Sequence, residues 1–146
     1  MKQYWQEIYK QKKHISLWPW SDLISEFKSL NINKKINILE IGCGSGANIP
    51  FFLKQNCNYH AIDKSSHIIN KLKKKYPKLK KNLIVSNLLN DFSFKKKQFD
   101  LIFDRAAISH NHIQDIRKII YKSTNLLQKK GYFIGIDWYS ESSSEY

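Results

Sequence analysis

The sequence has no long apolar run, because no segment approaches the roughly 18 apolar residues that a membrane-spanning helix needs. Charged residues interrupt residues 1–20 throughout, so this segment offers no apolar stretch of the kind found in secretory signal peptides. On these grounds the sequence predicts neither a membrane protein nor a secreted one. We expect a cytoplasmic protein.

Cysteine is scarce, with only Cys43 and Cys57. The first falls in a glycine-rich turn and the second just before a predicted strand, so we expect them at opposite ends of a sheet. Two cysteines so placed predict neither a disulfide nor a metal site.

Arginine is equally rare, since Arg105 and Arg117 are the only arginines among 25 basic residues in a chain of net charge +13. A basic chain can bind nucleic acid, but specific recognition of phosphates and bases relies on guanidinium groups. The lysine-rich runs 73–75, 78–81 and 95–97 are predicted on helix ends and loops, where such runs are usually solvated. We therefore favour solvated lysines, and an RNA-binding face is the alternative.

The 146 residues suffice for one domain that buries roughly 70% of its unfolded surface. Strand and helix patterns alternate from residue 36 onward, which predicts an α/β fold with a parallel sheet. The apolar patterns predict strands at 36–42, 59–63, 83–86, 99–104 and 132–138. They predict helices at 3–12 and 21–30, after Asn48, from Ser65 to Pro77, and at 113–130 before a stop at Gly131.

Residues 38–46 (ILEIGCGSG) are the most informative segment, with an apolar strand that contains Glu40 and then three glycines at alternate positions. Glycines let the backbone turn sharply and let a ligand approach where a Cβ would obstruct it. This pattern predicts a nucleotide-cofactor loop, and a tight turn without a ligand is the alternative. Asn48 is predicted to cap the next helix, with Pro50 in its first turn.

The glycines alone do not identify the cofactor. Gly42, Gly44 and Ala47 match the dinucleotide fingerprint, and Asp63 follows about 20 residues later as a ribose-binding acid, so an NAD-binding oxidoreductase is one hypothesis. Three features favour another nucleotide cofactor. Glu40 precedes the turn, the third glycine, Gly46, comes earlier than in the dinucleotide fingerprint, and the sequence has no second cofactor-binding half.

Four segments, in order, resemble motifs of the class I S-adenosylmethionine-dependent methyltransferases: ILEIGCGSG, YHAIDKSS, FDLIFDRAA and LLQKKGYFIGID. The resemblance runs from about Tyr4 to Trp138. It implies a three-layer Rossmann-like sandwich with a mainly parallel sheet of order 3-2-1-4-5, and methyl transfer from S-adenosyl-L-methionine to a small-molecule acceptor. A truncated or degenerate interaction module without turnover is the non-enzyme alternative.

The family sheet has seven strands, and the last two have no counterpart in this sequence. The expected fold is therefore truncated at its C-terminal side, and strand 132–138 forms an open edge. Such an edge is an aggregation hazard unless it is covered. Either the sequence is a fragment of a longer chain, or a homo-oligomer or another partner covers this edge.

The resemblance also implies the cofactor site. Asp63 would accept both ribose hydroxyls, while Asn87 and Leu88 hold the place of the adenine-binding residues, with Asp91 as a second candidate. Asp104 is either a ligand or the cap of the following helix. The complete predicted cofactor set is Glu40, Gly42, Cys43, Gly44, Ser45, Gly46, Asp63, Lys64, Asn87, Leu88 and Asp104.

For the methyl acceptor, His110 is the predicted general base, because it follows the fourth strand, where ligands of open α/β sheets bind. Arg105 is predicted either to bind an acidic group of the substrate or to pair with Asp104. Residues 1–35 would form a helical lid, 36–140 the cofactor-binding core and 141–146 a disordered tail. The aromatic residues of the lid segment either cover the substrate or pack as core: Tyr4, Trp5, Trp18 and Trp20.

Overall fold

The computed structural model describes residues 7, 11, 15–87, 89–90 and 94–136. Along the chain these form α2 (Ser21–Ser29), β1 (Ile36–Ile41), α3 (Ile49–Phe52), β2 (Cys57–Asp63), α4 (Ser66–Lys75), the short 3-10 helix η1 (Pro77–Leu79), β3 (Leu83–Val85), β4 (Phe99–Arg105), α5 (Ile113–Leu126) and β5 (Leu127–Ile136). The helix predicted at 3–12 lies almost wholly outside the described residues, and the tail 141–146 lies outside them altogether.

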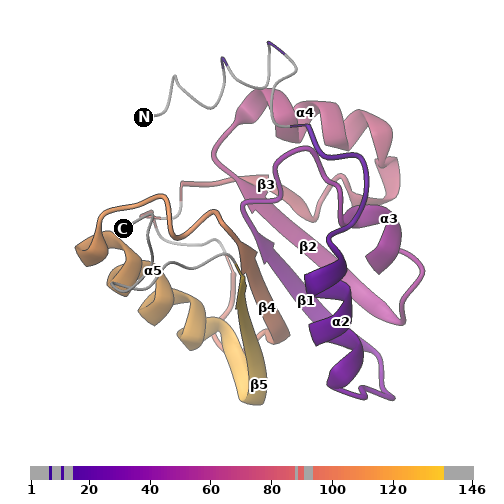
Figure 1. Ribbon diagram of the computed structural model, residues 1–146, viewed down its shortest axis with the longest axis vertical. Helices are drawn as coiled ribbons and strands as arrows, with labels where there is room; N and C mark the ends of the chain where they lie inside the picture. Colours follow the sequence, from indigo (N-terminus) through magenta and orange to yellow (C-terminus); the bar gives the residue numbers. More distant parts are fainter. Residues whose placement is uncertain (1–6, 8–10, 12–14, 88, 91–93, 137–146) are drawn as a thin grey trace.

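The strands form one sheet of order β3-β2-β1-β4-β5, and every neighbouring pair is parallel (Figure 1). This confirms the predicted α/β class and strand order. Because β1 lies at the centre, between β2 and β4, the loops that follow these three strands meet at one edge of the sheet. The carboxyl ends of parallel strands are where open α/β sheets bind ligands.

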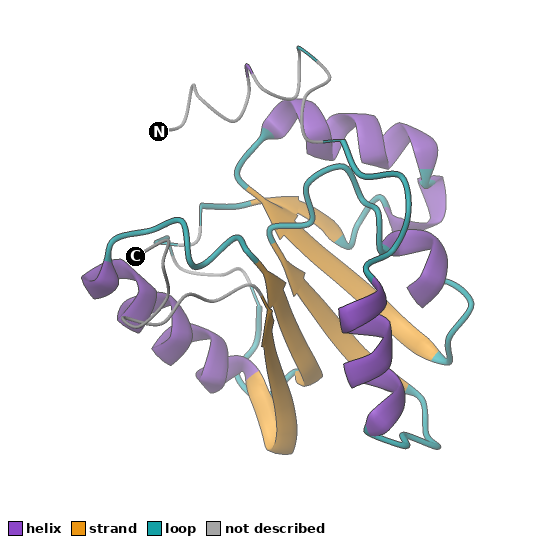
Figure 2. Cartoon of the chain, viewed as in Figure 1, coloured by secondary structure: helices purple, strands orange, loops and turns teal. Residues whose placement is uncertain are grey.

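Helices cover both faces of the sheet, as predicted for three layers (Figure 2). One apolar core joins α2, α3 and α4 to the face that carries Ile38, and a second joins α5 to the face that carries Leu39. Both side chains are fully buried although they are neighbours in β1. Successive strand residues point to opposite faces, so burial of both fits a strand covered on each side.

The ends of α4 follow the sequence signals. The Ser65 hydroxyl accepts a hydrogen bond from the backbone N–H of Ile68 at 3.3 Å, and the helix ends before Pro77. Within the described part of the chain, no helix combines the length and apolar character needed to cross a membrane.

The prediction that the long C-terminal helix reaches Lys130 was wrong, because α5 ends at Leu126 and β5 begins at Leu127. The pairing with β4 jumps from Phe99–Leu127 to Leu101–Tyr132, so the segment 128–131 forms a bulge. Gly131 serves close packing there rather than helix termination. A Cβ on it would lie 3.1 Å from the carbonyl oxygen of Asp100.

β5 is an edge strand, as predicted, and the Tyr132 side chain on it is 48% exposed. An exposed strand edge can pair with another chain. The cover of this edge by an oligomer or a partner stays a prediction.

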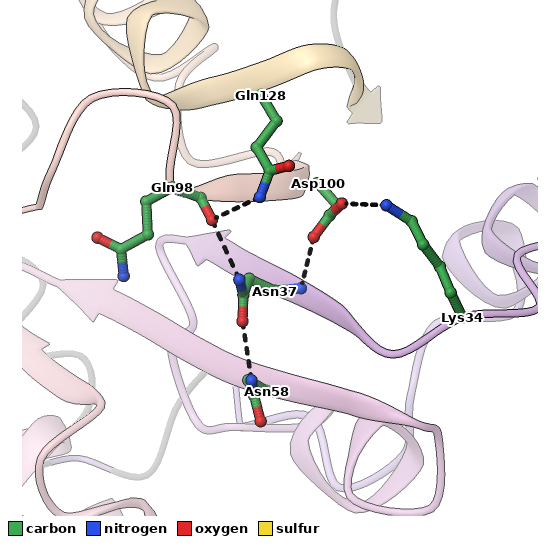
Figure 3. Close-up of polar contacts among 6 residues, drawn as sticks. All are labelled: Lys34, Asn37, Asn58, Gln98, Asp100 and Gln128. Carbon is green, nitrogen blue, oxygen red and sulfur yellow. Dashed lines mark hydrogen bonds and ion pairs between the residues drawn. The ribbon is translucent and has the colours of Figure 1, made fainter.

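At the amino ends of the strands, Asp100 connects β4 to β1 (Figure 3). Its Oδ2 accepts a hydrogen bond from the backbone N–H of Asn37 at 2.9 Å, and its Oδ1 pairs with the Lys34 ammonium at 2.8 Å. The Asn37 amide in turn donates to the Gln98 carbonyl and accepts from the Asn58 amide. These contacts tie β1, β2 and β4 together on the side opposite the strand ends that bind ligands.

We expect Asp100→Ala to destabilise the fold by roughly 1–3 kcal/mol, because the Asn37 N–H loses a charged acceptor. Lys34→Ala removes only the ion pair. Its side chain is 71% exposed, so the expected loss is about 1 kcal/mol or less. Urea unfolding of both variants at neutral pH checks this, and equal losses would contradict the role given to the backbone acceptor.

Candidate functional site

A cavity of about 500 Å³ lies beyond the carboxyl ends of β1, β2 and β4. Its wall brings together most of the predicted site residues: Glu40, Gly42, Cys43, Gly44, Ser45, Asp63, Lys64, Asn87, Arg105 and His110. Of the other predicted residues, Leu88 and Asp91 lie outside the described residues, and Gly46 and Asp104 do not line the cavity. The volume lies within the range of roughly 300–1,000 Å³ that small-molecule sites occupy.

The three glycines after β1 adopt left-handed conformations, with φ of 70° at Gly42, 48° at Gly44 and 77° at Gly46. A Cβ on Gly42 would lie 2.2 Å from the Cβ of Ala107, and one on Gly46 would lie 2.6 Å from the Leu72 side chain. These two glycines therefore make room for neighbouring protein groups. Gly42 and Gly44 also line the cavity, and the prediction that the glycines let a ligand approach stays a prediction.

Asp63 stands at the end of β2 in the cavity wall and is 6% exposed. Its Oδ2 accepts a hydrogen bond from the Gly44 N–H at 2.9 Å, and its Oδ1 accepts from the Ser65 N–H at 2.8 Å. Burial raises the pKa of this carboxyl, and the two backbone N–H groups oppose the rise. Each carboxylate oxygen can accept more than one hydrogen bond, so Asp63 can hold the glycine turn and a ligand diol together.

Glu40, at the cavity end of β1, is buried and bonded at both oxygens. The Asn48 amide donates to Oε1 at 2.9 Å, and the Tyr59 hydroxyl donates to Oε2. Burial raises the pKa of Glu40 to about 7 against the opposing effect of these two hydrogen bonds. The Asn48 Oδ1 accepts from the Trp20 N–H at 3.2 Å, so this side chain links β1 to the N-terminal segment.

The predicted capping role of Asn48 was wrong. Its side chain makes no capping hydrogen bond to α3, because its amide is engaged by Glu40 and its oxygen by Trp20. A buried carboxylate requires a donor, and the Asn48 amide supplies it to Glu40.

We expect Glu40→Gln to weaken the pH dependence of stability between about pH 5 and pH 8. The pKa of Glu40 is about 7 in the folded protein against an ordinary 4.5, so the folded state holds an extra proton in this window. Stability therefore falls as the pH rises through it, by roughly 3 kcal/mol at about 1.4 kcal/mol per pKa unit. Glutamine can accept from Asn48 and donate to the Tyr59 oxygen, which preserves the packing.

The measurement is urea unfolding of both proteins at about pH 5 and about pH 8. Asp63, whose pKa is also raised, contributes in the same direction to both proteins, so the difference between them isolates Glu40. An equal pH dependence in the two proteins would contradict the assignment.

Arg105 is the last residue of β4 and lines the cavity. Its guanidinium carbon lies 3.4 Å from the centroid of the Trp20 ring, and its Nε lies 3.6 Å from Asp22 Oδ2. The structure thus places Arg105 against Trp20 and Asp22 of the N-terminal segment, and its pairing with Asp104 stays a prediction.

Asp104 is completely buried behind the cavity wall. Its Oδ1 accepts hydrogen bonds from the backbone N–H groups of Ala107 at 3.1 Å and Ile108 at 3.0 Å. These contacts hold the turn after β4, within which Ala106 adopts a left-handed φ of 58°. Of the two predicted roles, the contacts favour the cap, although the capped element is this turn and not α5.

The N-terminal segment passes beside the glycine turn. The Ser45 hydroxyl donates to the Ser16 carbonyl at 2.7 Å, and Ile15, Ser16 and Trp20 line the cavity. Trp18 is 79% exposed and Trp20 is 37% exposed, so the alternative that these two pack as core was wrong. Tyr4 and Trp5 lie outside the described residues.

The remaining predicted residues have less specific surroundings. Asn87 lines the cavity, and its Oδ1 accepts from the Leu89 N–H at 3.3 Å. Cys43 is buried beside the cavity and burial raises the pKa of its thiol, so it stays protonated at neutral pH. His110 is exposed at the cavity rim, and its role as a base stays a prediction. Cys43 and Cys57 are both free, as predicted.

Sequence reasoning missed several residues of the wall: Ile15, Ser16, Ala47, Asn48, Ala106, Ala107 and Asn111. None of them carries a charge, and only Ala47 belongs to the glycine pattern, where it gave no sign of contact with a ligand. Asn111 had a recognisable position next to His110, and its amide donates to the carbonyls of Ala107 and Ile108.

The donor set fits S-adenosylmethionine. Asp63 offers carboxylate oxygens to a ribose diol, beside a turn whose backbone is held against it through Gly44. Glu40 and Asp63 place acidic groups at the ends of β1 and β2, and Lys64 after β2 and Arg105 at the end of β4 place basic groups in the same wall.

Solved structures of similar fold include methyltransferases. A methyltransferase from Aquifex aeolicus matches with a TM-score of 0.68 at 21% identity, over 96% of this chain and 76% of its own. Phosphoethanolamine N-methyltransferase 1 of Haemonchus contortus, in complex with phosphoethanolamine and S-adenosylhomocysteine, matches with a TM-score of 0.73 at 14% identity, over 91% of this chain and 30% of its own.

Sequence comparison agrees. Phosphoethanolamine N-methyltransferase of Plasmodium falciparum (isolate 3D7) is 26% identical over 110 residues, which are 75% of this chain and 41% of that enzyme. The chain thus spans less than half the length of this relative. The methyltransferase domain family matches residues 38–131, from the central strand β1 to the bulge in β5. The chain therefore belongs to the methyltransferase domain family, whose cofactor is S-adenosylmethionine.

Proposed function

We propose that this chain binds S-adenosylmethionine in the cavity and transfers its methyl group to a small-molecule acceptor. The observation that carries the proposal is Asp63, a nearly buried carboxylate in the cavity wall that also holds Gly44 of the glycine turn. The cavity offers room for an acceptor beside the cofactor, on the side of Arg105 and His110.

The cofactor supplies a methyl group on a sulfonium, a leaving group that needs no activation. The acceptor atom forms its bond to the methyl carbon as the carbon–sulfur bond breaks, and any proton it carries leaves for a base. The task of the protein is therefore to align the acceptor and exclude water. Trp20 and Ser16 close the wall from the N-terminal segment, and His110 is the side chain at the rim that can take up a proton.

Isothermal titration calorimetry tests cofactor choice. We expect heat on addition of S-adenosylmethionine or S-adenosylhomocysteine and none with NADH. Binding of NADH alone would overturn the proposal in favour of an oxidoreductase.

Turnover needs an acceptor, and phosphoethanolamine is the first to test because the Plasmodium relative is named for it. Transfer of a labelled methyl group from the cofactor to the acceptor is the measurement. Cofactor binding without transfer to any of a panel of small molecules would favour the alternative of an interaction module.

A further inference from the structure

The cavity wall carries charges of both signs. Glu40 and Asp63 stand at the ends of β1 and β2, Lys64 follows Asp63, and Arg105 stands at the end of β4. Of the two arginines in the chain, Arg105 lines the cavity and Arg117 is exposed on α5. An anion that enters this cavity is repelled by the carboxylates and attracted to Arg105 and Lys64.

The guanidinium of Arg105 is held in place from two directions. The Trp20 ring lies against it, with 3.4 Å between the guanidinium carbon and the ring centroid, and Asp22 lies at its Nε. Trp20 is itself tethered through its backbone N–H to Asn48. The Arg105 side chain is 21% exposed, and a guanidinium stacked on a ring loses little freedom when it binds a ligand, which favours affinity.

The contact with Asp22 does not make this arginine purely structural. Its separation of 3.6 Å exceeds hydrogen-bond length, and the Asp22 side chain is 42% exposed. Such a pair is weakened by solvent, so an oxyanion that reaches hydrogen-bond distance can compete with Asp22 for the guanidinium. Arginine binds carboxylates and phosphates through two parallel N–H bonds.

We infer that the methyl acceptor carries an oxyanion, a carboxylate or a phosphate, which Arg105 binds while the acceptor atom lies beside His110. This inference rests on the proposed function and adds the chemical class of the acceptor to it. Ala106 and Ala107, which follow Arg105 in the same cavity wall, have small side chains.

The test uses the full chain saturated with S-adenosylhomocysteine and titrated with inorganic phosphate, with acetate and with neutral acetamide. We expect phosphate or acetate to bind and acetamide not to bind. Arg105→Gln should weaken oxyanion binding roughly ten- to hundredfold, the range for lost hydrogen bonds to a charged group. Arg117→Gln removes the same charge on α5 and should leave binding unchanged. Tighter binding of phosphate than of acetate identifies a phosphate-bearing acceptor, and the reverse order identifies a carboxylate.

Asp22→Asn provides a second variant in case Arg105→Gln does not fold. It removes the competing carboxylate and should tighten oxyanion binding at least about twofold. Three results would each overturn the inference. The first is equal oxyanion binding by the wild type and the folded Arg105→Gln variant. The others are unchanged or weaker binding by Asp22→Asn and the absence of oxyanion binding by the wild type. Loss of S-adenosylhomocysteine binding by the wild type would instead overturn the proposed function.

Discussion

Asp63→Ala is expected to weaken the binding of S-adenosylhomocysteine by roughly 1.5–3 kcal/mol, which is about a ten- to hundredfold rise in Kd. The variant loses the carboxylate that faces the cavity and, with it, the acceptor for the backbone N–H groups of Gly44 and Ser65. Both losses act in the same direction, because the glycine turn is held in place by the carboxylate that would also bind the ribose. Isothermal titration calorimetry of the folded variant measures the effect.

Asp115→Ala is the matched control, since it removes a carboxylate from the first turn of α5, which does not line the cavity. Its Kd should equal that of the wild type. Thermal unfolding of both variants establishes that the proteins are folded at the temperature of the titration. Unchanged affinity in a folded Asp63→Ala variant would remove Asp63 from the cofactor site.

Gly42→Ala is expected to lower stability by roughly 2–4 kcal/mol, a large part of the roughly 5–15 kcal/mol that stabilises a typical domain. Gly42 has a φ of 70°, which strains any residue with a side chain. The added Cβ would also lie 2.2 Å from the Cβ of Ala107, so the turn after β4 would have to move. Thermal or urea unfolding gives the change in free energy.

A double-mutant cycle separates the two causes. Ala107→Gly removes the atom that the new Cβ would meet, so the double variant should be about 1–2 kcal/mol more stable than the sum of the single changes predicts. The backbone strain at position 42 remains in the double variant. Additive losses would show that the overlap with Ala107 contributes nothing.

Much of the fold could be predicted because its signals are local. β1, β2 and β4 are apolar runs long enough to be recognised, and the turn signals after them are glycines or an acid followed by a helix start. The boundary between α5 and β5 could not be predicted in the same way. Leu127 continues the helical spacing of α5, and only its pairing opposite Phe99 makes it a strand residue.

The carboxylates and the glycine turn of the candidate site could be predicted, but the surroundings of Arg105 could not. The glycine turn and Asp63 follow two consecutive strands, β1 and β2, and the resemblance to methyltransferases depends on the same residues. Trp20 and Asp22, which contact Arg105, come from the N-terminal segment, 83 residues away at Asp22. No local pattern connects these positions with Arg105, so only the tertiary structure could reveal these contacts.

The sequence by itself determined the class of fold, the order of the strands and the glycine turn with Asp63, because backbone conformation and burial of strands depend on neighbouring residues. Only the tertiary structure decided that Gly42 makes room for Ala107, that Asn48 donates to Glu40, and that Arg105 lies against Trp20 in the cavity wall. These contacts join segments distant in the chain. Which of several chemically suitable partners meets each group depends on how the helices and loops pack around the sheet.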